Sequence, residues 1–218
     1  VPVCVLRDAV FPVVSERNPA LAELSAKGVK REVLEGIYVT GTVASWKDAA
    51  GGGPAKPVHV YTRSDSCGAA ACFAKFLGGR KQEDLGGIGV YGDPGLLDAA
   101  RGDPLGIGYS NFSYVFSREG PVVKGARLLP VDANGNGKAD PEEVFENRAA
   151  AVRAIESGAY PLARRNYFFV KGNPGGLARA FIAFALSDGG AKVVEEVGTS
   201  LPLPKKEREA ALKILGSK

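Results

Sequence analysis

Residues 58–69 read VHVYTRSDSCGA, an apolar strand pattern that leads directly into the start of a helix. The first turn of a helix has backbone N–H groups without an internal partner, and the helix dipole places partial positive charge there. Gly68 lets a ligand approach the backbone, and Arg63 adds a planar set of donors suited to a tetrahedral oxyanion. The stretch predicts an oxyanion site, although it also fits a helix capped by Asp65 or Ser66 beside a surface arginine.

Strands and helices are expected to alternate along the rest of the chain. Strand-like runs are found at 1–15, 58–62, 88–91, 105–109, 122–131 and 166–171. Helical patterns are found at 30–38, 66–77, 96–100, 141–157, 177–197 and 205–215. This order is typical of an α/β fold with a largely parallel sheet.

The composition narrows the class of protein. The chain has 218 residues, of which 45% are hydrophobic and 24% charged, as in an ordinary globular protein. The net charge of +4 is too small and too scattered to favour binding to nucleic acid. Cys4, Cys67 and Cys72, with the single His59, indicate neither a disulfide scaffold nor a cysteine–histidine metal cluster, and their redox state stays open.

Several segments together resemble the phosphate-binding proteins of ABC importers. RSDSCGA at 63–69 resembles the Arg-x-Asp-Gly-Ser-Gly-Thr motif of that family at a helix start. Further similar segments follow the family's order: LEGIYVTGTVASWKD at 34–48, GIGYSNF at 106–112, YPL at 160–162, NYFFVKG at 166–172, and FIAFALSDGGAKVVEEVGTSLPL at 181–203. The resemblance implies a periplasmic-binding-protein-like α/β fold with one complete lobe and part of a second.

The resemblance also implies how the chain is divided. Residues 1–160 would form the ligand-binding lobe, with an entering hinge strand and a calcium-type loop. Residues 161–218 would be the return strand and C-terminal helices of the other lobe. The segments 1–15 and 166–171 would lie side by side as the two strands that cross between the lobes.

The function implied by the resemblance is that of a solute-binding protein rather than an enzyme. Such a protein captures phosphate or a similar oxyanion for the membrane subunits of an ABC importer, in the periplasm or outside the cell. Anchoring to the membrane through a segment outside these residues is left open.

Within the motif, the resemblance assigns a role to each position. Arg63 matches the anion-binding arginine and Asp65 its acidic partner, while Cys67, Gly68 and Ala69 match Ser-Gly-Thr, so these five are the predicted ligand residues. A thiol is a poor donor, and Ala69 offers only its backbone N–H, so the identity of the oxyanion stays open.

Weak binding is expected from this chain alone. A first-lobe segment of the family, which supplies a second helix N-terminus and a carboxylate, has no counterpart in these residues. One arginine and a few backbone donors contribute about 1.5–3 kcal/mol each. This sum barely exceeds an association cost of about 4 kcal/mol or more.

VDANGNGKADPEEV at 131–144 has the spacing of a calcium-binding loop. The expected ligands are Asp132, Asn134, Asn136, the Lys138 carbonyl, Asp140 and Glu143. The preceding RLLPV reads as a strand, so the loop would lie outside an EF-hand pair. The same residues also fit an Asn/Gly-rich turn with Asp140 as the cap of a helix that starts at Pro141. We favour calcium.

Two further functions compete with oxyanion capture. A thiol at a helix N-terminus beside an arginine can be nucleophilic, so Cys67 could serve a cysteine-dependent enzyme with His59, although no third orienting group is evident. The chain could also be a calcium-stabilised interaction module. The GIGVYG pattern at 87–92 lacks the strand-then-helix context of a dinucleotide site, and we reject it.

Overall fold

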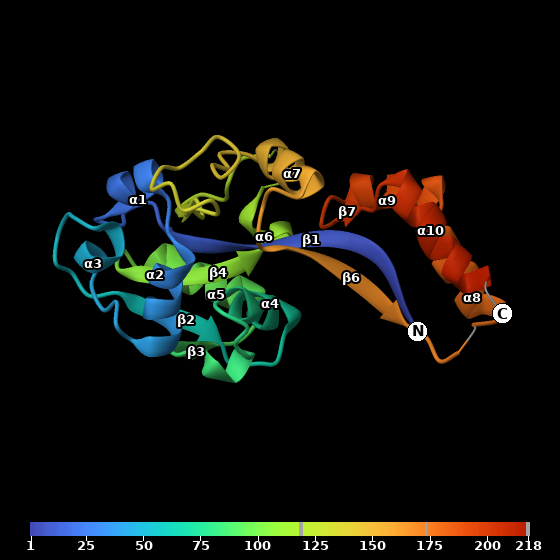
Figure 1. The fold of residues 1–218 in the computed structure, drawn as a ribbon, viewed down its shortest axis with the longest axis horizontal. Coiled ribbons are helices and arrows are strands. Elements are labelled where there is room, and N and C mark those ends of the chain that lie inside the picture. The colour runs from blue at the N-terminus through green and yellow to red at the C-terminus, as the bar shows by residue number, and fades with distance from the viewer. Residues whose placement is uncertain (118–119, 173, 217–218) are drawn as a thin grey trace. The chain divides into compact units, whose positions relative to one another are not determined.

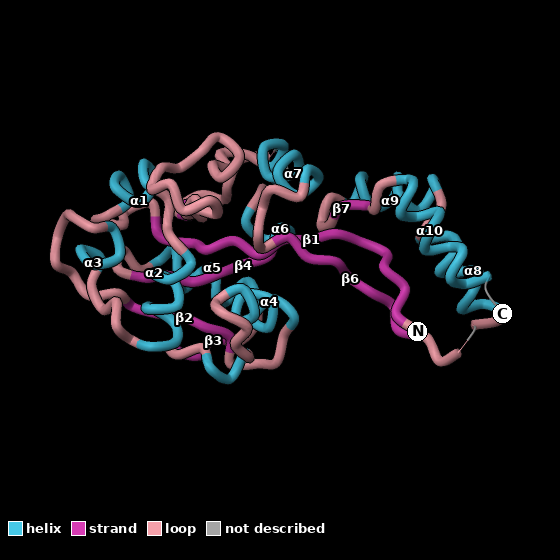
Figure 2. Tube along the Cα trace, in the orientation of Figure 1, coloured by secondary structure: helices cyan, strands magenta, loops and turns pink. Residues whose placement is uncertain are grey.

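Strands and short helices alternate in the computed structural model, which describes residues 1–117, 120–172 and 174–216, with side chains up to Lys213 (Figures 1 and 2). The strands are β1 (Pro2–Ser15), β2 (His59–Arg63), β3 (Ile88–Val90), β4 (Gly106–Asn111), β5 (Ala126–Leu128), β6 (Ala163–Phe169) and β7 (Leu201–Pro202). The first helices are α1 (Leu21–Lys27), α2 (Arg31–Glu35), α3 (Trp46–Ala50), α4 (Gly68–Phe76) and α5 (Asp93–Gly102). The later helices are α6 (Phe112–Val115), α7 (Arg148–Ser157), α8 (Gly176–Ala185), α9 (Asp188–Val197) and α10 (Lys205–Gly216).

The chain divides into two compact units. The larger unit consists of residues 9–162, and the smaller unit of residues 1–8 and 163–218. The sequence interpretation placed the division after residue 160 and kept residues 1–8 with the larger unit. The first residues of β1 belong to the smaller unit because Leu6 and Arg7 pair with β7, and Val1 bonds to Val170.

The sheet of the larger unit is mixed, with strand order β3-β2-β4-β1-β5. β2 pairs in parallel with both β3 and β4, whereas β1 is antiparallel to β4 and β5. The expectation of a largely parallel sheet is therefore wrong for β1, which is antiparallel to both of its neighbours in this sheet. The apolar run at 1–15 identified a buried strand but carried no signal for its direction, which the pairing of residues 10–14 with β4 decides.

An aromatic core fixes β4 against the helices of the larger unit. Tyr109 of β4 is fully buried and stacks on Phe73 of α4, with ring centroids 4.6 Å apart. Tyr38 packs edge-on against Phe73 at 4.9 Å. Trp46 is buried and donates its indole N–H to the Leu105 carbonyl at 3.0 Å. This core packs α4 and β4 together beside the end of β2.

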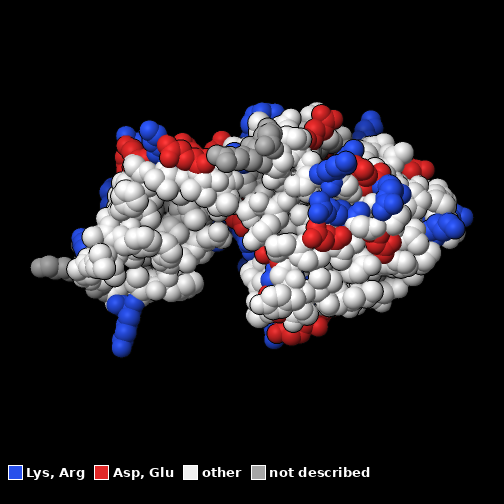
Figure 3. Space-filling view, turned by 180° about the vertical axis from the view of Figure 1, so that it is seen from behind, with Lys and Arg blue, Asp and Glu red and all other residues white. Residues whose placement is uncertain are grey.

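The smaller unit has a small core of its own. Its buried residues are Val3, Val5, Ile182, Leu186, Leu203 and Ala211. Figure 3 shows a broad surface of this unit without Lys, Arg, Asp or Glu. The exposed large apolar side chains of this unit include Phe169, Leu177, Phe181, Phe184 and Val197. The apolar side chains of this unit are thus divided between a small core and an exposed surface.

The prediction that 1–15 and 166–171 lie side by side is confirmed. β6 pairs with β1, and Val1 and Val170 exchange backbone hydrogen bonds of 2.5 and 3.0 Å. Within the smaller unit, Arg164 of β6 donates from Nε and Nη2 to Asp8 of β1 at 3.1 and 2.6 Å.

Two expected helices differ from the structure. The run 177–197 forms two helices, because the Ser187 hydroxyl caps α9 by accepting the Gly190 N–H at 3.1 Å. The run expected as a helix at 141–157 is helical only over α7, where the Asn147 side chain accepts the Ala150 N–H at 3.0 Å. In the described part of the chain, no helix is both long and apolar enough to cross a membrane.

Candidate functional site

Arg63 is the last residue of β2, at the edge of the sheet where the parallel strands β3 and β4 also end. β2, β3 and β4 run in the same direction, so their carboxyl ends share that edge, a usual place for ligand sites in α/β sheets. The Arg63 backbone N–H donates to the Tyr109 hydroxyl at 3.2 Å, and the Thr62 hydroxyl lies 2.9 Å from the same oxygen. The buried Tyr109 therefore fixes the backbone from which the arginine projects.

The Arg63 guanidinium forms a two-point contact with Asp65. Nε donates to Oδ1 at 2.8 Å and Nη2 donates to Oδ2 at 2.5 Å. The Arg63 side chain is only 5% exposed. Hydrogen bonding to Asp65 raises the pKa of the guanidinium, and the same contact lowers the pKa of the Asp65 carboxyl. Asp65 thus lies within hydrogen-bonding reach of Arg63 as expected, and both groups are charged.

A second carboxylate also meets this guanidinium. Asp93, the first residue of α5, places Oδ1 2.7 Å from Nη1 of Arg63. Gly92, just before it, donates its N–H to Oδ1 of Asp65 at 3.1 Å. The sequence reasoning missed Asp93. An acidic residue before proline at a helix start, after a strand parallel to β2, is the signal that could have identified it.

The N-terminus of α4 follows directly. Cys67 is its cap, and the sulfur accepts the Ala70 N–H at 3.3 Å. Gly68 and Ala69 are the first two helical residues, so their N–H groups have no acceptor within the helix. Gly68 is exposed, whereas the side chain of Ala69 is buried. The five predicted ligand residues therefore lie in one strand–turn–helix segment; their convergence on one ligand stays a prediction.

Gln82 closes the turn between β2 and α4 and was also missed. Its Nε2 donates to the Asp65 carbonyl at 2.7 Å, and its Oε1 accepts the Cys67 N–H at 3.0 Å. It lies in a 3-10 turn at Gln82–Asp84, where the sequence shows no motif.

The cysteine-enzyme alternative finds no support in this geometry. His59 contacts Asp103, with Nδ1 2.6 Å from Oδ2, and the Tyr61 hydroxyl donates to the same oxygen at 2.9 Å. The Cys67 sulfur serves as a helix cap. The imidazole therefore has a different partner from the one that activation of the thiol would require.

The 132–143 loop is organised by hydrogen bonds between its side chains and its backbone. The Asp132 carboxylate is buried and accepts the Gly135 and Gly137 N–H groups at 2.7 and 3.0 Å. Glu143 is buried too, and it accepts the Ala133 N–H at 2.7 Å.

The remaining side chains of this loop contact one another. The Asn134 and Asn136 amide nitrogens donate to Oδ2 of Asp140 at 2.7 and 2.8 Å. Lys138 uses its backbone N–H for a bond to Oδ1 of Asn136 at 2.8 Å. Among the described residues, no group of three or more His, Cys, Asp or Glu side chains is arranged to hold a metal ion. Calcium would require both asparagine amides to turn their oxygens inward, and its binding stays a prediction.

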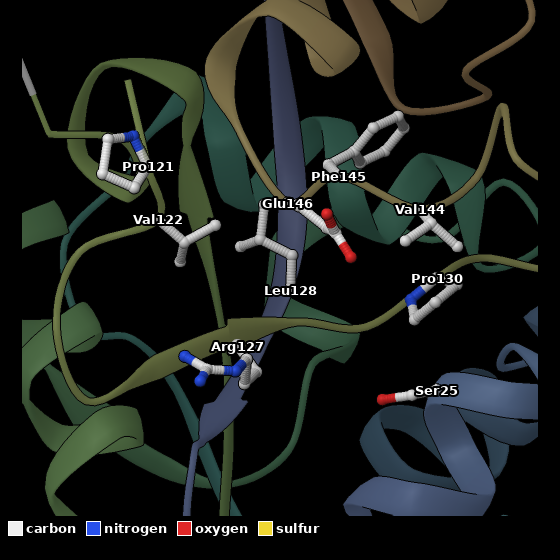
Figure 4. A pocket seen from close by; sticks show the side chains of 9 residues that line it. All are labelled: Ser25, Pro121, Val122, Arg127, Leu128, Pro130, Val144, Phe145 and Glu146. Atoms are coloured by element: carbon white, nitrogen blue, oxygen red, sulfur yellow. The ribbon is translucent and has the colours of Figure 1, made fainter. Parts of the chain in front are cut away.

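A separate pocket of about 440 Å³ lies elsewhere in the larger unit (Figure 4). It is lined by Ser25 of α1, by Arg127 and Leu128 of β5, and by Pro121, Val122, Pro130, Val144, Phe145 and Glu146. None of the five predicted ligand residues lines it.

Comparison with known proteins decides the family. A family model described as a PBP superfamily domain matches residues 1–189, most of the chain. The chain belongs to the PBP superfamily. This confirms the predicted family resemblance and the α/β fold class.

Relatives of this PBP superfamily member include the phosphate-binding protein PstS of Bacillus subtilis (strain 168). The two are 25% identical over 181 residues, which cover 83% of this chain and 51% of the relative. The chain thus spans about half the length of the curated relative that it matches.

Solved structures share the fold of this PBP superfamily member. A possible phosphate-binding protein from Planctomyces limnophilus DSM 3776 has a TM-score of 0.72 at 21% identity, and the match covers 99% of this chain and 72% of that one. A putative phosphate ABC transporter substrate-binding protein with bound phosphate from Clostridium perfringens has a TM-score of 0.67 at 22% identity, with coverage of 94% and 72%.

Proposed function

We propose that this chain is the oxyanion-binding part of an extracytoplasmic solute-binding protein that captures phosphate or a similar tetrahedral oxyanion for an ABC importer. The observation that carries the proposal is the buried Arg63 guanidinium, held by Asp65 directly before the N-terminus of α4. The name of the Bacillus subtilis relative supports phosphate as the class of ligand.

The segment from Arg63 to Ala69 contributes to binding by holding its donors in place before a ligand arrives. A guanidinium has five N–H donors, and the hydrogen bonds to Asp65 use two of them. Its two bonds to Asp65 fix the plane of the group before a ligand arrives, which lowers the entropic cost of binding. The N–H groups of Gly68 and Ala69 add donors that carry the positive end of the helix dipole.

Delivery to the membrane subunits of an ABC importer, and a location in the periplasm or outside the cell, are parts of the same proposal. They rest on the family and on the names of its relatives. Because the chain covers about half of the curated relative, the affinity of these residues alone is expected to be weak.

The decisive test replaces the arginine. Arg63→Ala is expected to abolish the binding of phosphate, arsenate and sulfate, and Arg63→Lys to weaken it because a point charge cannot replace the planar fork. Binding is followed by the amide NMR signals of Gly68 and Ala69 during anion titration, which detects weak affinities. Arg31→Ala is the matched control, since Arg31 is exposed and pairs with its neighbour Glu32. Equal shifts in Arg63→Ala and in the unmodified chain would rule the function out.

A further inference from the structure

The Arg63 guanidinium meets two carboxylates, which differ in how they contact it. Asp65 engages two nitrogens through directed hydrogen bonds, at Nε and Nη2. Asp93 lies 2.7 Å from the third nitrogen, Nη1. The Arg63 side chain is 5% exposed and the Asp93 side chain 17% exposed, so the ion pair lies in a largely water-excluded position.

The contact with Asp93 is close but poorly directed. Nη1 of Arg63 and Oδ1 of Asp93 are both buried, and neither has a hydrogen-bond partner of acceptable geometry in the described part of the chain. The two atoms attract each other as charges without meeting the directional preference of a hydrogen bond. A ligand oxygen that took the place of the Asp93 carboxylate and lay along an N–H of Nη1 would satisfy this nitrogen better than Asp93 does.

We propose that Asp93 is an internal competitor of the ligand, which occupies the Arg63 donor that an oxyanion would use and thereby lowers affinity. The inference rests on the proposed function and concerns the same site. It assigns opposite roles to the two carboxylates. Asp65 orients the arginine and favours binding, whereas Asp93 opposes it.

The charges around the guanidinium also support the competitor role of Asp93. One guanidinium beside two carboxylates has a net charge of −1 when all three groups are ionised. An incoming anion therefore meets a cluster with net negative charge. The N-terminus of α4 contributes partial positive charge beside it. Repulsion between an anion and a carboxylate a few ångströms away in a partly buried site changes affinity by at least about tenfold.

A purely structural role for Asp93 gives a different expectation. An acidic residue in the first turn of α5 interacts favourably with the helix dipole. If this were its only role, its replacement would lower the stability of the protein and leave anion affinity unchanged.

The test compares two substitutions that change the charge equally at the same guanidinium. Asp93→Asn is expected to bind inorganic phosphate and sulfate at least about tenfold more tightly than the unmodified chain. Asp65→Asn is expected to bind both more weakly, because the guanidinium loses its orientation. Asp98→Asn is the control: it makes the same charge change in α5 at an exposed residue that pairs with Arg101, and it should change nothing.

The titrations use the full chain, with the Gly68 and Ala69 amide signals as readout and chloride holding the ionic strength constant. Thermal unfolding checks that each variant folds. If Asp93→Asn does not fold, Asp93→Ser serves as a second neutral variant. If the unmodified chain binds and Asp93→Asn binds no more tightly, the competitor role is wrong while the proposed function stands. If both asparagine variants gain affinity alike, only net charge matters, and the competitor role is again wrong. If no protein responds to either anion, both proposals fail.

Discussion

The Gln82 side-chain amide donates a hydrogen bond of 2.7 Å to the backbone carbonyl of Asp65, and its oxygen accepts the Cys67 N–H at 3.0 Å. One side chain thereby holds both ends of the turn that joins β2 to α4. Because Asp65 in turn orients Arg63, this bridge determines the positions of the arginine and the helix N-terminus relative to each other.

Loss of the Gln82 bridge is expected to loosen the site. Gln82→Ala removes two hydrogen bonds from a half-buried position and should lower the free energy of unfolding by roughly 1–2 kcal/mol, with weaker phosphate binding. Gln82→Glu keeps the acceptor for Cys67 but loses the donor to Asp65, so its effect should be intermediate. Denaturant unfolding and phosphate titration measure both effects. An unchanged affinity in Gln82→Ala would show that the bridge is not needed for the site.

The Arg63–Asp65 pair should make stability depend on pH at the acid end. Because the pKa of Asp65 is lowered in the folded protein, chiefly by hydrogen bonding to Arg63, its contribution is fully present above the unfolded carboxyl pKa of about 3.9 and is lost as the pH falls below it. The stability difference between the unmodified chain and Asp65→Asn should therefore be largest at neutral pH and shrink in acid. Urea unfolding at pH 7 and pH 3 provides the comparison. If the stability difference between the unmodified chain and Asp65→Asn is the same at both pH values, this prediction is wrong.

Cys67 is expected to act as a helix cap and not as a nucleophile. Serine is a strongly preferred capping residue and a better hydrogen-bond donor than a thiol. Cys67→Ser should therefore raise stability by about 0.5–1 kcal/mol and strengthen phosphate binding, whereas Cys67→Ala should lower stability by a similar amount. Thermal unfolding and phosphate titration give the two values. Loss of binding in Cys67→Ser would mean that the sulfur itself is required.

Calcium should raise the melting temperature of the protein if the 132–143 loop binds it. The side-chain oxygens of Asp132, Asp140 and Glu143 would then lie roughly 2.3–2.6 Å from the ion, and the amides of Asn134 and Asn136 would turn their oxygens toward it. Glu143→Gln should abolish the shift in melting temperature. Glu142→Gln, at the exposed neighbouring residue, should retain it. If calcium leaves the melting temperature of the unmodified chain unchanged, the loop is a turn without a metal.

The sequence alone was enough to predict the local parts of the site. The Arg63–Asp65 pair is local, because a single residue separates the two in the sequence. The start of α4 follows from a capping residue before an apolar helical pattern. Both features depend on neighbouring residues, so a single sequence contains the information.

The larger arrangement depended on contacts between distant segments. Asp93 reaches Arg63 because β3 lies parallel to β2, with Arg63 opposite Val90, so that the segments after both strands meet at one edge. The direction of β1 is likewise set by its partner β4 and not by its own apolar pattern. Residue patterns specify which elements form, whereas strand pairing across the sheet decides which side chains meet at Arg63.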